Sequence, residues 1–390
     1  MVRHWVKKLI PHWEDVNDQD VRSRYGYLGG WLSIVVNVAL FLLKGLFGIL
    51  LGSVALIADG VHSLSDVATS VIVVASFKWA RKPSDTVHPF GHGRMEAIAT
   101  LVMAVLLVVL GLEFFKTSIG RISHPVDYRV NFWIVGFVVL TILVKEWLAR
   151  FTNILSRMIG SSTLEADSWH HRTDALSSIL VLAAFVGQYF GLSIMDGIAG
   201  ILISGFIMWT GWIIAKDGVD DLLGKRPSAE LVDKIKRAAR ECPEVLDIHD
   251  LIIHQYGQQM VLSLHIQIPE TLSLKEAHRI SEKVEMIVLD RFRAYATIHL
   301  DPVNVADPEL KLIREYIQNI LDHRDFKVEY HDLRIIEEDM DCTLLFDLVV
   351  DPATEDREID RLKGILETSI RDRFPSFQKI RIKVEPKYAL

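Results

Sequence analysis

The sequence has few charged residues and very few cysteines. Charged side chains make up 24% of the 390 residues, half of the residues are hydrophobic, and the formal net charge is −7. This balance excludes an intrinsically disordered chain and a basic nucleic-acid-binding protein. The two cysteines, Cys242 and Cys342, are too few for a disulfide scaffold, so we expect reduced cytoplasmic thiols. No uninterrupted apolar stretch precedes Tyr25, so we expect no cleaved signal peptide.

The hydrophobic residues are concentrated in the first half of the chain. It contains long runs without charged residues, such as WLSIVVNVALFLL, LVMAVLLVVLGL and FWIVGFVVLTILV. A membrane-spanning helix needs about 20 mostly apolar residues. The pattern predicts six spans, near residues 26–49, 54–79, 95–118, 130–151, 164–189 and 193–215.

Basic residues predict the orientation of these spans. The links Leu51-Gly52 and Phe190-Gly191-Leu192 carry no charge, whereas Lys and Arg residues flank most of the other helix ends. Cytoplasmic loops are enriched in Lys and Arg. We therefore expect both termini in the cytoplasm. The third link, with Lys116, Arg121 and Arg129, weakens this contrast without reversing it.

The second half of the chain contains a tandem repeat. After Lys216 about 85 residues predict helix, strand, strand, helix and strand, and then the order recurs: His249-Asp250-Leu251 matches His331-Asp332-Leu333, and LSLHIQI matches LLFDLVV. We therefore predict an α-helical membrane protein with six transmembrane helices followed by two tandem α+β domains. The predicted parts are an N-terminal segment 1–24, a transport domain 25–215, a first α+β domain 216–306 and a second 307–390.

Two predicted spans carry ionisable residues at matching positions. His62 and Asp66 lie four residues apart, as do His170 and Asp174, so each pair shares one helix face. Charged residues inside a membrane are costly and usually functional. Two imidazoles and two carboxylates form a tetrahedral set that suits Zn²⁺ or a similar divalent ion. Asp59, Asp167 and His171 lie close by, and we interpret them as an approach path, as neighbours of the ligands, or as ordinary interhelical hydrogen-bonding groups.

Three long segments resemble one family. GSVALIADGVHSLSD, HPFGHGRMEAIATL and LEADSWHHRTDALSS are similar to the cation diffusion facilitators, which are six-helix divalent-metal/proton antiporters, and the resemblance extends to about residue 302. It implies a transport site at His62, Asp66, His170 and Asp174, ferredoxin-like cytoplasmic domains, a homodimer and Zn²⁺ as the expected substrate and regulatory ligand. Carriers of manganese, iron, cobalt and cadmium share this scaffold, so the choice of metal stays open.

The resemblance also marks a second cluster, between the second and third spans. Asp85, His88 and His92 in DTVHPFGHGR match a peripheral metal site of some members, although the segment also fits a tight Gly/Pro turn with hydrogen-bonding histidines. Arg94 resembles a charge interlock at the family's dimer interface, with Asp220 or Asp221 as partners; a solvated surface charge is the alternative.

A third cluster lies in the first repeat. The positions that match the family's regulatory metal ligands are His249, His265, His278, His299 and Asp301. In the second repeat the positions of His265 and His278 become Asp347 and Asp360, and those of His299 and Asp301 become Lys383 and Glu385. A lysine opposes cation binding. We therefore interpret the second repeat as a copy that kept the fold, lost the binuclear site, and either enlarges the dimer interface or binds something else.

These features together predict proton-coupled export of divalent cations, most simply Zn²⁺, by alternating access in a homodimer in a bacterial plasma membrane. Protonation of a ligand such as His170 removes the lone pair that holds the metal, which couples export to protons. The alternative is a membrane-anchored metal sensor or scaffold that binds without transport. An enzyme is not expected, because no nucleophile elbow, HExxH or phosphate loop occurs in the sequence.

Overall fold

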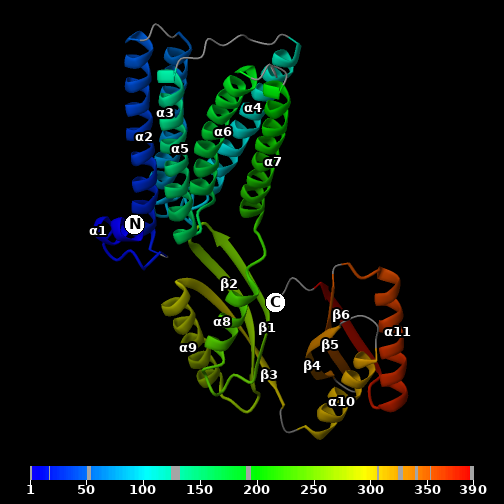
Figure 1. Cartoon of the computed structure of the whole chain (residues 1–390). Coiled ribbons are helices and arrows are strands. Elements are labelled where there is room, and N and C mark those ends of the chain that lie inside the picture. Colours follow the sequence, from blue (N-terminus) through cyan, green and yellow to red (C-terminus); the bar gives the residue numbers. More distant parts are fainter. Residues whose placement is uncertain are drawn as a thin grey trace. The chain divides into compact units, whose positions relative to one another are not determined.

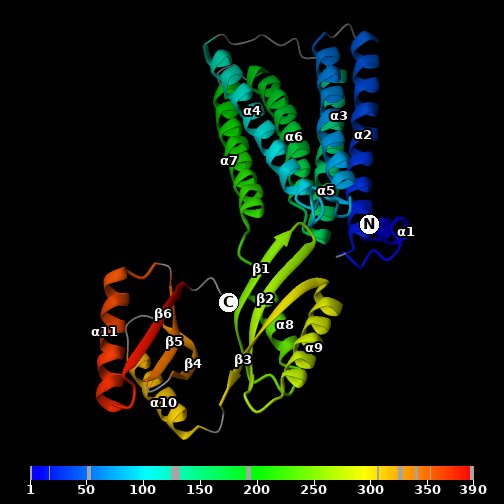
Figure 2. The same ribbon diagram turned by 180° about the vertical axis from the view of Figure 1, so that it is seen from behind.

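The computed structural model describes residues 2–16, 18–50, 54–123, 132–189, 195–304, 307–323, 328–338, 341–351 and 353–386. These residues form two compact units, one of Met1–Lys225 with Tyr256–Gln259 and one of Arg226–Gln255 with Met260–Leu390. Figures 1 and 2 show that long helices make up the first unit and that strands with shorter helices make up the second. The predicted links at 51–52 and 190–192 lie outside the described residues.

The first unit begins with a short helix, α1 (Val2–Leu9). Six helices of 27 to 32 residues follow it in the described chain. They are α2 (Gln19–Leu50), α3 (Val54–Ala80), α4 (Met95–Ser123), α5 (Phe132–Ile159), α6 (Ser162–Tyr189) and α7 (Met195–Leu223). Because a helix rises 1.5 Å per residue, each is long enough to cross the hydrocarbon core of a bilayer, which is about 30 Å thick.

Composition supports a membrane location for three of these helices. Gln19–Phe47, Gly60–Ala80 and Met95–Ile122 are long and apolar enough to span a bilayer, among the described residues. Large apolar side chains such as Val35, Val109 and Leu202 point outward and are exposed. Exposed apolar surface on this scale is costly in water and favourable in lipid. The helices also extend past the predicted spans, with α2 beginning at Gln19 and α7 ending at Leu223.

Glycines allow the helices of the first unit to approach closely. The most extensive helix contacts join α2 with α3, α4 with α7 and α5 with α6. A Cβ atom built on Gly26 of α2 would lie 2.1 Å from the Phe77 ring of α3, and one on Gly200 of α7 would lie 2.1 Å from the Ser118 hydroxyl of α4. Small residues at helix contacts are typical of membrane bundles, where close packing drives association.

A buried ion pair connects α2 and α4. Arg22 donates to both carboxylate oxygens of Glu96, over 2.8 Å from Nε and 2.7 Å from Nη2. Arg22 also donates to the backbone carbonyl of Ile159, at the end of α5. Both side chains are nearly enclosed, with 7% and 12% exposed. Three segments of the bundle are therefore joined at one buried guanidinium group.

The second unit contains the same αββαβ order twice. The first copy comprises α8 (Ala229–Ala239), β1 (Asp247–Tyr256), β2 (Gln259–Pro269), α9 (Leu274–Phe292) and β3 (Ala294–Val303). The second comprises α10 (Pro308–Asp322), β4 (Glu329–Glu338), β5 (Asp341–Val350), α11 (Asp356–Arg373) and β6 (Lys379–Pro386). Each copy forms a three-stranded sheet with its strands in chain order. The helices cap as their sequences indicate: Ser273 and Glu276 form a capping box at α9, and Asp307 caps α10 ahead of Pro308.

The strand registers of the two sheets place equivalent residues of the two copies at equivalent positions. The parallel pairing of β2 with β3 places His265 opposite His299, and that of β5 with β6 places Asp347 opposite Lys383. These are the substitutions that the sequence alignment of the repeats gives. Each copy has a core of its own, centred on residues such as Leu264 and Val284 in the first and Phe346 and Leu366 in the second.

Candidate functional site

The bundle brings the four predicted intramembrane ligands together. His62 and Asp66 lie one turn apart on α3, and His170 and Asp174 one turn apart on α6. Asp66 Oδ1 is 3.6 Å from His170 Nε2 and 3.9 Å from His62 Nε2, and His170 Nε2 is 3.9 Å from Asp174 Oδ2. Asp66, His170 and Asp174 are buried, whereas 44% of the His62 side chain is exposed. One member of the set is thus accessible while the others are enclosed.

Ligand atoms of His62, Asp66 and Asp174 lie close enough together to hold one metal ion. Ligand atoms of a tetrahedral zinc site are about 3.3 Å apart, because Zn–N and Zn–O bonds are about 2.0–2.2 Å long. The distances of 3.6 to 3.9 Å between the paired atoms are slightly larger than this.

Sequence reasoning missed a lysine at this site. Lys145 of α5 donates to Asp66 Oδ2 over 2.8 Å and to Asp174 Oδ2 over 2.7 Å, and only 3% of its side chain is exposed. The signal was present, because Lys145 follows the apolar run FWIVGFVVLTILV inside a predicted span. The rule that marked the histidines and aspartates marks this residue as well. The two carboxylates therefore share a protein cation.

A second buried polar group on α6 contains Asp167 and His171. His171 Nε2 is 3.4 Å from Asp167 Oδ2 and 2.9 Å from the Ser33 hydroxyl of α2, and all three side chains are fully enclosed. Ser33 also donates to Asp167 over 3.4 Å. These contacts favour the interhelical hydrogen-bonding interpretation of Asp167 and His171. The side chain of Asp59 lies outside the described residues.

The predicted peripheral cluster also assembles, in the loop between α3 and α4. Asp85 Oδ1 is 3.4 Å from His88 Nδ1, Asp85 Oδ2 is 3.5 Å from His92 Nε2, and the two rings are 4.5 Å apart. The three residues form a group able to hold a metal ion. Asp85 also accepts hydrogen bonds from the backbone N–H groups of His88 and Val87, which lower the pKa of its carboxyl. The loop thus has the geometry of both predicted interpretations, a turn and a metal-binding cluster.

Arg94 has a contact that the sequence does not indicate. Its guanidinium lies 4.4 Å from the centre of the Tyr256 ring, and Phe90 stacks on the same ring at 4.5 Å. Tyr256 belongs to the first unit, with the turn that follows β1. A cation over an aromatic face is attracted by the ring quadrupole. The charge interlock with Asp220 or Asp221 stays a prediction.

The predicted cytoplasmic cluster centres on Asp301 of β3. Asp301 Oδ2 is 3.0 Å from His265 Nδ1 and 3.2 Å from His249 Nε2, and Asp301 Oδ1 is 3.4 Å from His299 Nε2. Strand register explains the arrangement, because His265 and His299 are paired neighbours on β2 and β3. His249, His265 and Asp301 form a group able to hold a metal ion.

The electrostatics of this cluster are dominated by the Asp301 carboxylate. Burial raises the pKa of the Asp301 carboxyl, but the imidazoles of His249 and His265 outweigh it and hold that pKa well below its usual range. The same contact raises the pKa of His265. The contact between Asp301 and His265 therefore favours the charged carboxylate and the protonated His265 imidazole together.

His278 does not join the other four residues. It lies on α9, 71% exposed, with its Nε2 3.4 Å from Glu282 one helical turn away. Within one chain an outward-facing position on α9 does not reach the strands that carry the other four residues, so the role of His278 as a ligand stays a prediction.

Comparison with known proteins assigns the chain to a family. A family model described as the cation efflux transmembrane domain matches residues 30–223, and one described as the cation efflux protein cytoplasmic domain matches residues 227–303. The two matches end before the second repeat. They coincide with the helical bundle and with the first αββαβ copy.

Similar proteins cover the same region. An uncharacterized transporter of Methanocaldococcus jannaschii is 36% identical over 278 residues, which are 70% of this chain and 97% of the relative. Metal tolerance protein 2 of Oryza sativa subsp. japonica is 31% identical over 65% of this chain and 72% of its own length. The cation-efflux pump FieF of Salmonella arizonae is 28% identical over 75% of this chain and 98% of its own length.

The helical bundle with apolar spans and enclosed ionisable residues is that of an integral membrane protein. The chain belongs to the cation diffusion facilitator family, whose members transport divalent metal cations. The resemblance found in the sequence motifs is thereby confirmed.

Proposed function

We propose that this protein exports Zn²⁺ from the cytoplasm in exchange for protons, as a homodimer whose six long helices all span the membrane. The observation that carries the proposal is the convergence of His62, Asp66, His170 and Asp174 from two helices, where all but His62 are buried. Two imidazoles and two carboxylates match the nitrogen and oxygen ligands of zinc. The four-residue arrangement on each helix accounts for the geometry.

Lys145 adds a step to this mechanism. Its ammonium group lies on Oδ2 of both carboxylates, at 2.8 and 2.7 Å, while Oδ1 of Asp66 faces the two histidines. A divalent ion therefore competes with the Lys145 ammonium group for the charge of Asp66 and Asp174. When the ion leaves, Lys145 returns, so the buried carboxylates have a cationic partner both with and without metal. This exchange avoids the cost of leaving two charges unpaired in a low-dielectric interior.

Proton coupling follows from the same residues. A protonated imidazole cannot coordinate a metal, so acid on the release side ejects the ion from His62 and His170. His62 is the most exposed of the four residues, with 44% of its side chain accessible. Proton binding and metal binding thus exclude each other at one place.

The proposal extends to assembly and orientation. The match to a domain described as cytoplasmic supports placing the second unit, and with it the C-terminus, in the cytoplasm. In this proposal six spans, an even number, put the N-terminus on the same side of a bacterial plasma membrane. Exposed His278 beside Glu282 on α9 offers ligand atoms to a second copy of the chain, which agrees with a homodimer. The two αββαβ copies are the predicted ferredoxin-like domains in this proposal.

Metal flux into proteoliposomes with an imposed pH gradient tests the proposal. The purified chain would be given Zn²⁺, Mn²⁺, Fe²⁺, Co²⁺ and Cd²⁺ in parallel, with a pH dye inside the vesicles. Zinc flux accompanied by counter-movement of protons is expected. Flux of another metal would change the assigned substrate, and binding of metal without any flux would favour the membrane-anchored sensor.

A further inference from the structure

The second repeat places a histidine against the ligand cluster of the first. His331 of β4 stacks on His249 of β1, with ring centres 4.7 Å apart. His331 Nε2 lies 3.3 Å from Asp250 Oδ1. Ligand atoms of His249, Asp250 and His331 lie within 4.8 Å of one another. None of these contacts follows from the family model, whose match ends at residue 303.

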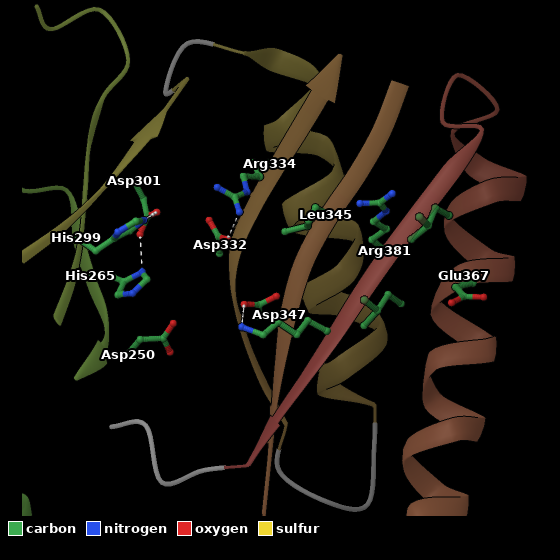
Figure 3. A pocket seen from close by; sticks show the side chains of 13 residues that line it. Asp250, His265, His299, Asp301, Asp332, Arg334, Leu345, Asp347, Glu367 and Arg381 are labelled. Carbon is green, nitrogen blue, oxygen red and sulfur yellow. Dashed lines mark hydrogen bonds and ion pairs between the residues drawn. The ribbon is translucent and has the colours of Figure 1, made fainter. Parts of the chain in front are cut away.

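The pocket beside these residues is lined by both repeats. It has a volume of about 500 Å³. Figure 3 shows Asp250, His265, His299 and Asp301 on one wall, and Asp332, Arg334 and Asp347 on the other. Two basic residues of the second repeat form ion pairs within that repeat. Arg334 pairs with Asp332 at 3.2 Å and Lys383 pairs with Asp347 at 3.6 Å. Asp250 is paired with an imidazole instead.

Four buried polar atoms at this point make no well-aligned hydrogen bond among the described residues, although His331 Nε2 lies 3.3 Å from Asp250 Oδ1 and His249 Nε2 lies 3.2 Å from Asp301 Oδ2. They are both ring nitrogens of His249, Oδ1 of Asp250 and Nδ1 of His331. His249 is about 95% buried, so water does not satisfy it freely. A buried polar atom without a partner costs about 1–3 kcal/mol. Imidazole nitrogens and a carboxylate oxygen gathered at one buried place are the donor set of a divalent transition metal.

Backbone geometry points to the same pair of motifs. Asp250 and Asp332 both have positive φ, of 50° and 54°, in the middle of strands. A left-handed conformation at a residue other than glycine costs about 1–3 kcal/mol and tends to persist at functional sites. The second copy has exchanged other ligand positions, with Asp347 and Lys383 in place of His265 and His299. It nevertheless keeps the His-Asp pair together with its strained backbone.

From these observations we infer that the two repeats of one chain bind a divalent cation between them, with His249, Asp250 and His331 as ligands. The second repeat supplies a ligand from its own sequence and has not lost metal binding altogether. The cation joins the two repeats, because His249 and Asp250 belong to the first and His331 to the second. This inference concerns binding alone and stands whether or not the bundle transports metal.

Metal stoichiometry of the full-length protein in detergent tests the inference. Asp250→Asn and His331→Asn each remove one ligand, and asparagine tolerates the left-handed backbone at position 250. His323→Asn is the matched control, because His323 is an exposed histidine of the same repeat, bonded to the Asn319 carbonyl over 2.7 Å. Zinc would be counted by mass spectrometry after equilibrium dialysis, and circular dichroism would compare the folding of all four proteins.

Wild type and His323→Asn are expected to bind equal amounts of zinc, and Asp250→Asn and His331→Asn to bind one ion fewer per chain. With Co²⁺ as the probe, the visible absorption of cobalt bound by nitrogen and oxygen ligands should be lower in Asp250→Asn and His331→Asn by the contribution of one ion per chain. Unchanged zinc stoichiometry in folded Asp250→Asn and His331→Asn would overturn the inference. A failure of zinc flux in proteoliposomes would not overturn the inference, because this experiment measures bound zinc and not transport.

Discussion

Lys145 Nζ lies 2.7 Å from Asp174 Oδ2 in the enclosed centre of the helical bundle, and the same ammonium group reaches Asp66 Oδ2. A lysine in this position makes the metal-free site electrostatically balanced. It also makes metal binding a competition between a divalent ion and a tethered monovalent one. Under the proposed function, a residue that is not a ligand would thus set part of the strength of zinc binding at this site.

Replacement of Lys145 with methionine should therefore tighten metal binding and weaken the metal-free protein. Removing one partner of a buried ion pair typically costs about 3–5 kcal/mol, because the remaining charges are unpaired. We expect Lys145→Met to lower the melting temperature without metal, to recover it when Zn²⁺ is added, and to lower the zinc Kd at least tenfold. Calorimetry and thermal melts of the detergent-solubilised protein would measure both effects.

Lys44→Met is the control for this change, since Lys44 is equally buried but donates to the Ser63 hydroxyl over 2.9 Å. Its zinc Kd should stay at the wild-type value. An unchanged zinc Kd in Lys145→Met would contradict the competition between lysine and metal.

Arg22 should be a major contributor to the stability of the bundle. Arg22→Met leaves the Glu96 carboxylate and the Ile159 carbonyl without their donor in a region where both partner side chains are nearly enclosed. The expected loss is about 3–5 kcal/mol. Arg150→Met, which removes a 2.7 Å pair with Glu146 from a side chain that is 72% exposed, should change the stability by less than about 1 kcal/mol. Equal melting temperatures for the two variants would show that the Arg22 pair contributes little.

The contact of α2 with α3 should be sensitive to a single methyl group. At Gly26 a Cβ would lie 2.1 Å from the buried Phe77 ring, so Gly26→Ala forces the two helices apart and should cost about 1–3 kcal/mol. Gly45 of the same helix has nothing within 4 Å of its Cβ position, so Gly45→Ala should stabilise the helix by about 0.5–1 kcal/mol. Denaturation of the purified variants would measure both, and a Gly26→Ala protein as stable as Gly45→Ala would contradict the close packing.

Part of the arrangement of the candidate metal ligands could be predicted from spacing alone. His62 and Asp66, like His170 and Asp174, share a helix face by their four-residue separation, and the structure places both pairs at one point. The strand pairing of His265 with His299 follows similarly from the alternation of residues in the repeats. Local periodicity carries this information because it fixes the direction of each side chain.

Contacts between distant segments could not be predicted in this way. Nothing local to Lys145 indicates that its ammonium group reaches two carboxylates on two other helices, and nothing in β4 indicates that His331 stacks on His249. Both depend on how separate elements pack. His278 shows the converse: its position in the sequence fits a ligand, but its helix directs it away from the cluster.

Zinc flux by Asp174→Ala in proteoliposomes tests the central claim most directly, because Asp174 is both a proposed ligand and the partner of Lys145. Asp217→Ala is its control, since Asp217 is a half-exposed aspartate that pairs with Lys225 at 3.8 Å. We predict that Asp174→Ala lowers the initial rate of zinc uptake at least a hundredfold, while Asp217→Ala keeps the wild-type rate. Wild-type flux in folded, membrane-inserted Asp174→Ala would contradict transport through the site formed by His62, Asp66, His170 and Asp174.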